Sequence, residues 1–134
     1  MGKHMKKFNP SLAALAVAFV LSAASALAGE IQPYEAAAFT EAKAAGKTVL
    51  LDFHADWCPV CRKQGPVIES LVREDGFKNI VAFKVNYDDE PALKKQLKVT
   101  SQSTLIVFKG GQEVSRATGV VDKTDIRALI EKGL

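Results

Sequence analysis

The segment Thr48–His54 limits the fold more than any other part of this chain. It reads TVLLDFH, a continuous apolar run interrupted by a single aspartate, which is typical of a strand buried on both faces of a sheet. A helical pattern begins at about Cys58 and contains Pro66, which is expected to kink the helix because proline removes one backbone hydrogen bond. The sequence therefore predicts a buried strand that leads, within a few residues, into the start of a helix.

Helical and strand patterns alternate through the rest of the chain. The predicted order is helix, strand, helix, strand, helix, strand, strand, helix, which indicates one α/β domain around a mixed sheet. The segments other than the two above are a helix at Pro33–Ala45 ended by Gly46, a strand at Ile80–Asn86, a helix at Glu90–Leu97, strands at Thr104–Lys109 and Glu113–Ala117 joined by Gly110 and Gly111, and a last helix capped by Asp122 or Thr124 with apolar residues at Ile126, Leu129 and Ile130.

Length and charge narrow the classes of function. A chain of 134 residues has room for one domain. Its net charge of +3 comes from Lys3, Lys6 and Lys7, since no acidic residue precedes Glu30 and residues 29–134 hold 15 basic and 15 acidic residues. A basic surface for nucleic acid is therefore not expected. The glycine pair Gly110-Gly111 joins two strands rather than opening a helix, so no nucleotide-binding loop is predicted either.

The first 28 residues have the pattern of a secretory signal peptide. A basic start from Met5 precedes an apolar run from Leu12 to about Leu21, and Ala26-Leu27-Ala28 supplies small residues at the cleavage site. We expect cleavage after Ala28, a domain of residues 29–134, and a bacterial periplasmic location. Met1–His4 precede the apparent natural start and are either an extension or the remnant of a tag. The alternative is an uncleaved membrane anchor, for which the apolar run is short.

The only two cysteines, Cys58 and Cys61, form a Cys-x-x-Cys motif at the predicted start of the helix. Unpaired backbone N–H groups at a helix N-terminus favour an anion, so Cys58 is expected to ionise near neutral pH and act as an exposed nucleophile. Cys61, one turn further along, is expected to resolve the mixed disulfide. The spacing therefore predicts thiol–disulfide exchange.

Three other uses of the cysteines are open. A structural disulfide would close a very short loop and gain little chain entropy. Structural zinc needs about four ligands, and residues 29–134 offer only His54 beside the two thiols. Copper(I) is soft enough for two thiolates, and Cys58 and Cys61 with Ser103 or His54 nearby could carry it. A copper carrier is thus the alternative to a redox enzyme.

The segment from Leu51 to Lys63, LDFHADWCPVCRK, resembles the active-site segment of the thioredoxin family. The similarity extends from about Tyr34 to Leu134, and Pro66 matches the proline within the family's active-site helix. The resemblance implies a thioredoxin-like fold, a central mixed sheet flanked by helices. It also implies a redox-active disulfide between Cys58 and Cys61 with no further cofactor.

Asp52 and Lys84 are predicted to support the two cysteines. The resemblance to the thioredoxin family implies that Asp52 is the family's buried carboxylate beneath the two cysteines. It also implies that Lys84 is the lysine that pairs with this carboxylate. Independently, a carboxylate within TVLLDFH is expected to be desolvated, which raises its pKa toward the range of a general base for Cys61. The alternatives are an aspartate at the surface and a lysine that only extends toward solvent.

The remaining candidates surround the substrate side of the motif. Trp57 is expected either to shield the thiolate and offer a partner an apolar contact, or only to pack in the domain. The dipeptide Pro59-Val60 is expected to tune the thiol pKa. By the resemblance, His54 stands where the family often carries a large aromatic residue, and it is expected either to modulate thiol ionisation or to bond locally. The predicted substrate-binding residues are Trp57, Pro59, Gln102, Ser103 and Gly119.

Ser103 marks the clearest departure from the family, which carries a cis-proline at this position of the loop. A cis bond before a residue other than proline costs about 3–4 kcal/mol. We therefore expect either a strained cis Gln102–Ser103 bond or a trans bond that reshapes the loop. Either outcome would alter substrate pairing and leave room for a metal near the sulfurs.

These observations predict an exported thiol–disulfide oxidoreductase that reduces protein disulfides. The signal peptide and the wording around Trp57 are similar to exported members of the family, including the soluble C-terminal domain of the membrane thiol–disulfide transducer. Such a transducer is the expected electron donor. The chain lacks the helical insertion of dedicated oxidants, which favours the reducing direction, and a monomer is expected.

Overall fold

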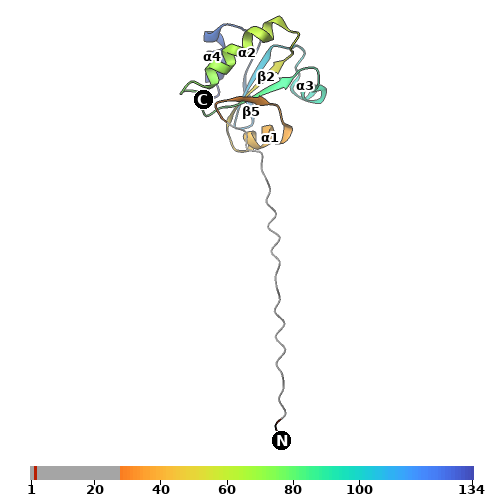
Figure 1. Cartoon of the computed structure of the whole chain (residues 1–134), viewed down its shortest axis with the longest axis vertical. Helices are drawn as coiled ribbons and strands as arrows, with labels where there is room; N and C mark the ends of the chain where they lie inside the picture. Colours follow the sequence, from red (N-terminus) through yellow and green to blue (C-terminus); the bar gives the residue numbers. More distant parts are fainter. Residues whose placement is uncertain (1, 3–27) are drawn as a thin grey trace.

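The computed structural model describes residue 2 and residues 28–134, and its strands and helices follow the predicted alternation with one addition (Figure 1). The predicted signal peptide lies outside the described residues except for Gly2 and Ala28. The elements are β1 (Ile31–Pro33), α1 (Ala36–Ala44), β2 (Thr48–His54), α2 (Pro59–Val72), β3 (Val81–Asn86), α3 (Pro91–Leu97), β4 (Thr104–Lys109), β5 (Gln112–Thr118) and α4 (Lys123–Glu131).

The strands form one mixed sheet in the order β1-β3-β2-β4-β5. Strands β1, β3 and β2 are parallel, and β4 runs antiparallel to both β2 and β5. The predicted α/β fold with a mixed sheet is confirmed. Strand β2 is paired on both sides and all seven of its residues are buried, as its apolar run indicates.

Strand β1 was not predicted, because the first helix was expected to begin at Pro33. Instead Pro33 ends a three-residue strand that pairs only with β3, and α1 begins at Ala36. Three residues are too few to show the two-residue period of a strand. A proline is tolerated there because β1 lies at the edge of the sheet, where one side of the strand makes no ladder bonds.

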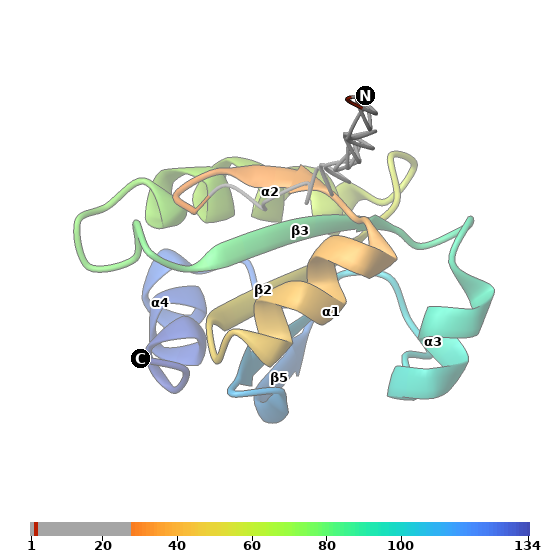
Figure 2. The same cartoon turned by 90° about the horizontal axis from the view of Figure 1, so that it is seen from below.

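Helices cover both faces of the sheet and divide the core in two (Figure 2). Val49, Leu51 and Phe53 of β2 pack in a cluster with residues of α1 and α3. Leu50 of the same strand packs in a second cluster with residues of α2 and α4. Because side chains alternate along a strand, Asp52 lies on the face of Leu50, which α2 covers.

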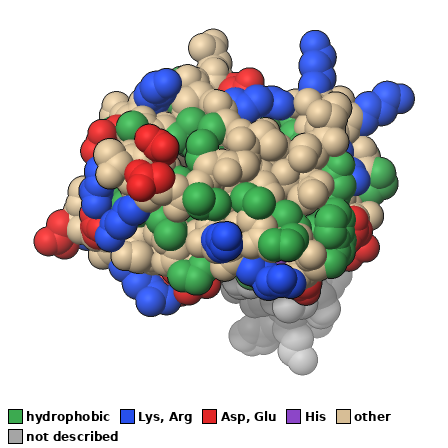
Figure 3. Space-filling view, turned by 90° about the horizontal axis from the view of Figure 1, so that it is seen from above, with side chains coloured by type: hydrophobic (Ala, Val, Ile, Leu, Met, Phe, Trp, Pro, Cys, Tyr) green, Lys and Arg blue, Asp and Glu red, His purple; other side chains and the backbone are tan. Residues whose placement is uncertain are grey.

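The exterior carries charges of both signs. On the face shown in Figure 3, Lys and Arg side chains lie among Asp and Glu side chains, with hydrophobic groups between them. This distribution agrees with the balance of 15 basic and 15 acidic residues in 29–134. Within residues 28–134, no helix has the length and apolar character needed to cross a membrane.

Candidate active site

Cys58 caps the N-terminus of α2. Its backbone is extended, with φ −85° and ψ 115°, and its Sγ accepts a hydrogen bond from the N–H of Cys61 at 3.3 Å. Pro59 follows in the first turn, where its missing N–H leaves no intrahelical bond unmade. The thiol therefore sits where the helix dipole and a free backbone donor both favour negative charge.

The hydroxyl of Ser103 lies between the two sulfurs. Its Oγ is 3.1 Å from Cys58 Sγ and 3.2 Å from Cys61 Sγ. Both cysteines are free thiols and pack with Ala55, while Tyr87 covers the cluster. Ser103 lies 45 positions after Cys58 and 42 positions after Cys61 in the sequence, yet its hydroxyl is within hydrogen-bond distance of both sulfurs.

The two thiols differ in acidity. Burial acts to raise the pKa of Cys58, but hydrogen bonds from the Cys61 thiol, the Ser103 hydroxyl and backbone N–H groups outweigh it and lower this pKa to about 7. Burial and the neighbouring Cys58 raise the pKa of Cys61. The predicted assignment of Cys58 as nucleophile and Cys61 as resolving thiol agrees with this difference.

Cys58 is less accessible than the sequence predicted. It is only 2% exposed, whereas an exposed nucleophile was expected. The reason is the packing of Ser103, Ala55 and Tyr87 around the first turn of α2. Val60 of the motif also packs on this cluster, but Ser103 and Tyr87 come from distant segments, so the motif alone could not show the whole cover. To reach Cys58 Sγ, a substrate disulfide must approach from a side that these residues leave open, or must displace some of them.

The Gln102–Ser103 bond is trans, so the alternative of a strained cis bond is wrong, and a loop reshaped relative to the family stays a prediction. Ser103 has φ +62°, a left-handed conformation that is uncommon for residues other than glycine. Its N–H donates to Phe53 O at 2.8 Å, and its carbonyl accepts from Gly119 N at 3.0 Å. Ser103 is 4% exposed and its hydroxyl faces the sulfurs, so the predicted contact with substrate is not open in this state.

Gln64 is a site residue that the sequence analysis missed. It is fully buried on α2, and its Nε2 donates to Ser103 O at 3.3 Å and to Val120 O at 2.6 Å. Its position could have indicated this role, because a residue three positions after Cys61 lies on the same inward face of the helix. A buried amide there needs hydrogen-bond partners. Gln64 therefore connects the helix of the cysteines to the loop that holds Ser103.

Asp52 lies buried beneath α2, as predicted. It is 2% exposed, and its Oδ1 has no hydrogen-bond partner among the residues that the structure describes. Burial raises the pKa of Asp52 to about 7, and the positive charge of Lys84 opposes this rise only in part. Asp52 and Lys84 are register partners on β2 and β3. The alternative of a surface aspartate is therefore wrong.

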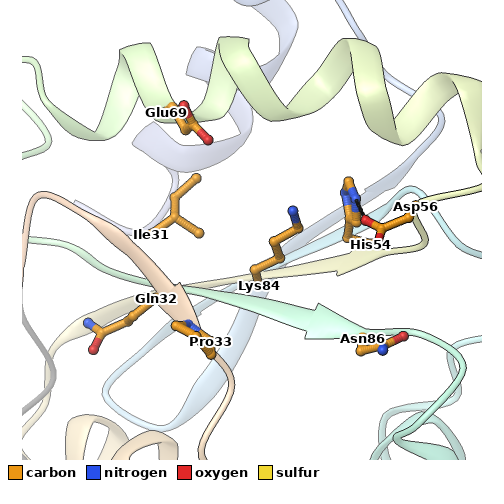
Figure 4. A pocket seen from close by; sticks show the side chains of 8 residues that line it. All are labelled: Ile31, Gln32, Pro33, His54, Asp56, Glu69, Lys84 and Asn86. Carbon is orange, nitrogen blue, oxygen red and sulfur yellow. Dashed lines mark hydrogen bonds and ion pairs between the residues drawn. The ribbon is translucent and has the colours of Figure 1, made fainter.

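A pocket of about 320 Å³ opens beside the site, between the edge of the sheet and α2 (Figure 4). The side chain of Lys84 extends into it toward α2, and His54 and Asp56 lie at one end. His54 Nε2 is 3.0 Å from Asp56 Oδ1, which supports the local-bonding interpretation of this histidine. Lys84 thus reaches solvent while its charge acts on the buried Asp52.

The other predicted substrate-binding residues surround the first turn of α2 and the Ser103 loop. Trp57 is 57% exposed and its indole N–H donates to Asp88 Oδ2 at 2.9 Å, so it is fixed at one edge rather than packed in the core. Pro59 and Gly119 are exposed, and Gln102 is half-buried beside Ser103. Their contact with a substrate stays a prediction.

Comparisons with known proteins agree with this geometry. The thioredoxin family model, described as "Thioredoxin", matches residues 30–132. The chain belongs to the thioredoxin family. It is 45% identical over 84 residues to a thioredoxin of Chlamydia caviae, covering 63% of this chain and 80% of that protein. It is 40% identical over 94 residues to a thioredoxin of Chlamydia trachomatis, covering 70% and 89%.

A solved structure gives the same result for the fold. This thioredoxin domain resembles Trxlp from Edwardsiella tarda EIB202 with a TM-score of 0.73 and 40% identity, over 75% of this chain and 98% of that one. With the Cys58-x-x-Cys61 pair in place, the protein is a thiol–disulfide oxidoreductase. The predicted thioredoxin-like fold is therefore confirmed together with the class of activity.

The donor set of the thioredoxin site bears on the copper alternative. Across residues 28–134, no group of three or more His, Cys, Asp and Glu side chains is placed to hold a metal ion. His54 pairs with Asp56, so a copper(I) carrier would depend on the two sulfurs, with only the weakly coordinating hydroxyl of Ser103 beside them. No feature of the site favours that role over thiol exchange.

Replacing Gln64 with alanine should loosen the Ser103 loop of the thioredoxin domain. The change removes two hydrogen bonds to carbonyls and leaves a small cavity, so the free energy of unfolding is expected to fall by about 1–3 kcal/mol. Denaturant unfolding measures this loss. Ser70→Ala is the matched control, because Ser70 is an exposed α2 residue whose hydroxyl accepts from the exposed Lys123 at 3.2 Å. Equal stability of Gln64→Ala and the parent would contradict the bridging role.

Proposed function

We propose that this protein is an exported thioredoxin that reduces protein disulfides in the bacterial periplasm. The observation that carries the proposal is the junction at residues 28–30. The family match begins at residue 30, two positions after the Ala26-Leu27-Ala28 sequence that a signal peptidase would cleave. Residues 1–28 therefore precede the family match, and they have the charge and hydropathy of a leader.

The geometry supports a two-step reduction. The Cys58 thiolate attacks a substrate disulfide, so that a bond forms between Cys58 Sγ and one substrate sulfur while the other leaves as a thiolate. Cys61 then gives its proton to Asp52, directly or through water, and its sulfur attacks Cys58 Sγ. The second substrate sulfur leaves as a thiolate. The dithiol loses two electrons, the substrate gains them, and the Cys58–Cys61 disulfide remains.

The raised pKa of Asp52, about 7, supports the role of a proton acceptor at neutral pH. Below this pH the carboxyl is protonated and cannot accept the proton of Cys61. Lys84 keeps part of the carboxylate ionised by its positive charge. We further propose that a membrane thiol–disulfide transducer returns the Cys58–Cys61 disulfide to the dithiol, since the periplasm supplies no reducing thiol pool of its own.

The direction of the reaction is tested by the reduction potential of the Cys58/Cys61 pair. Equilibration of residues 29–134 against glutathione and dithiothreitol should give a value near the roughly −270 mV of thioredoxin. A value near the roughly −120 mV of strong periplasmic oxidants would reverse the direction and make this protein a disulfide donor. Cys58→Ser is the control, because it cannot form the internal disulfide.

Export is tested separately in a bacterium that expresses the full chain. We expect the protein in the periplasmic fraction, with Gly29 at its N-terminus. The control is Ala28→Leu, which places a large residue where the peptidase needs a small one and should leave the leader attached. An uncleaved protein in the cytoplasmic fraction would overturn the proposed location without affecting the thiol chemistry.

A further inference from the structure

The position of Ser103 carries an inference beyond thiol exchange itself. One hydroxyl contacts both reacting sulfurs, at 3.1 and 3.2 Å, from a residue that lies 42 positions beyond the motif. Its backbone is fixed by Phe53 O, Gly119 N and the amide of Gln64, which belong to three different parts of the fold. The left-handed φ of +62° shows that the fold holds a serine in a conformation that favours glycine.

A hydroxyl carries one proton and two acceptor lone pairs. Ser103 can therefore donate to only one sulfur at a time, while it accepts the S–H of the other. With Cys58 as thiolate and Cys61 as thiol, Ser103 O–H donates to Cys58 Sγ, and the single S–H of Cys61 has Cys58 Sγ, Ser103 Oγ and Phe53 O as its acceptors. Hydrogen bonds to an ionised acceptor are about twice as strong as those between neutral groups, so this arrangement favours the ionised Cys58.

We propose that the Ser103 hydroxyl is a shared thiolate donor that follows the negative charge from Cys58 to Cys61 during one reaction cycle. In the free dithiol it donates to the Cys58 thiolate. Once Cys58 is bonded to the substrate sulfur, that sulfur is neutral, and rotation about the Cβ–Oγ bond lets the same proton serve Cys61 as its thiol is deprotonated. No atom is transferred by Ser103.

The proposal has a consequence for redox equilibrium. The disulfide form has no thiolate for the hydroxyl to stabilise, whereas the reduced form has one. Ser103 therefore stabilises the dithiol and makes the protein less reducing than it would be without the hydroxyl. The lowered pKa of Cys58, to which the Ser103 hydrogen bond contributes, agrees with this direction.

Other titratable groups surround the two sulfurs, and a test of the Ser103 hydroxyl requires that they be unchanged between the variants and the parent protein. Asp52 lies on β2 beneath α2, Tyr87 packs on the cysteines after β3, and the His54–Asp56 pair closes the end of β2. Lys84 acts on Asp52 from β3. All of these remain in a Ser103 variant, so a difference from the parent protein reports the hydroxyl.

The test compares Ser103→Ala and Ser103→Gly with the parent. Alanine removes the hydroxyl and keeps Cβ, while glycine removes it and also suits the left-handed backbone, which guards against a folding defect. Both variants should raise the pKa of Cys58 toward that of an ordinary thiol, measured by the ultraviolet absorbance of the thiolate. The equilibrium constant with glutathione should shift toward the disulfide by about twofold at pH 7 and about tenfold, or about 30 mV, at pH 9.

The growth of this shift with pH is the signature of the hydroxyl. At pH 7 about half of Cys58 is ionised in the parent, and at pH 9 nearly all of it is, so the stabilised species becomes fully populated. Single-turnover reduction should also show a slower second step. Without the Ser103 hydroxyl, the fraction of Cys61 present as thiolate is expected to fall about tenfold, while each thiolate becomes about threefold more nucleophilic because nucleophilicity rises with thiol pKa. The mixed disulfide is therefore expected to persist about threefold longer.

Two controls separate the hydroxyl from general effects. Ser115→Ala removes a buried hydroxyl whose partner is Leu129 O, and Lys98→Gly relieves the other left-handed residue that is not glycine among residues 28–134. Neither should change the pKa of Cys58 or the equilibrium. The proposal is overturned if Ser103→Ala and Ser103→Gly match the parent at both pH values, or if only one of them shifts. It compares variants with the parent, so it holds or fails independently of the proposed reducing direction.

Discussion

Replacing Cys61 with serine is expected to convert this enzyme into a covalent trap for its substrates. Cys58 still attacks a disulfide, because its thiolate is stabilised by the N-terminus of α2 and by Ser103. The serine hydroxyl cannot then displace the substrate sulfur, since an alcohol of ordinary pKa is almost never ionised at neutral pH. Turnover should fall to background while mixed disulfides accumulate on Cys58.

The measurement is electrophoresis of the full-length Cys61→Ser protein under non-reducing conditions, with mass spectrometry of the adducts. Dithiothreitol should release the captured proteins. Cys58→Ser is the matched control, because it makes the same small chemical change at a site three residues away and should capture nothing. Trapping by Cys58→Ser but not by Cys61→Ser would exchange the two roles.

Thermal unfolding of both variants guards this comparison. The two cysteines are buried in the same small cluster, and serine is more polar than cysteine. Each variant is therefore expected to lose about 1–2 kcal/mol of stability, which leaves most molecules folded. A variant that had unfolded could not report on the chemistry.

The part of the site that could be predicted from sequence follows local rules. Cys58 and Cys61 are fixed by a four-residue motif and by the start of α2. The burial of Asp52 follows from the apolar run of β2, whose two-residue period also places it on the face covered by α2. In each case the residues that determine the environment are neighbours in the chain.

The part that could not be predicted depends on contacts between distant segments. Ser103 meets the sulfurs only because its loop is bonded to Phe53 and Gly119, and Gln64 secures that loop from the helix. Tyr87 and Ser103, the distant residues of the cover over Cys58, have the same origin. The resemblance to the thioredoxin family showed that a serine at position 103 departs from the family. The direction of its hydroxyl, however, depends on the left-handed φ of +62°, which the presence of a serine does not predict.

Asp52→Asn is expected to stabilise the folded domain, and the gain should depend on pH. The pKa of Asp52 is raised by burial from 3.8 to about 7, so its ionised form is disfavoured in the folded state. The stability contributed by the protonated carboxyl is fully present below about pH 4 and is lost as pH rises to about 7. A shift of this size corresponds to roughly 4 kcal/mol above pH 7, less the cost of burying the asparagine amide, which faces the same lack of partners as Oδ1.

Urea unfolding of Asp52→Asn and the parent from pH 4 to pH 8 measures this gain. The two curves should nearly meet at pH 4 and separate through pH 7, with the variant more stable. Asp56→Asn is the matched control, since its carboxylate is exposed two residues beyond the end of β2 and its loss should change stability by less than about 0.5 kcal/mol. A difference that is constant with pH would show that Asp52 ionises normally in the folded protein.

The same variant should be slower as an enzyme while it is more stable as a fold. Without the carboxylate, Cys61 must lose its proton to water, so the mixed disulfide is expected to persist about tenfold to a hundredfold longer at pH 7. This delay should shrink above pH 9, because hydroxide then deprotonates Cys61 directly. If Asp52→Asn were more stable but resolved the mixed disulfide at the parent's rate at pH 7, the exchange reaction would not explain why this carboxylate is buried. If the variant is both more stable and slower to resolve the mixed disulfide, the unfavourable burial of Asp52 serves the resolving step.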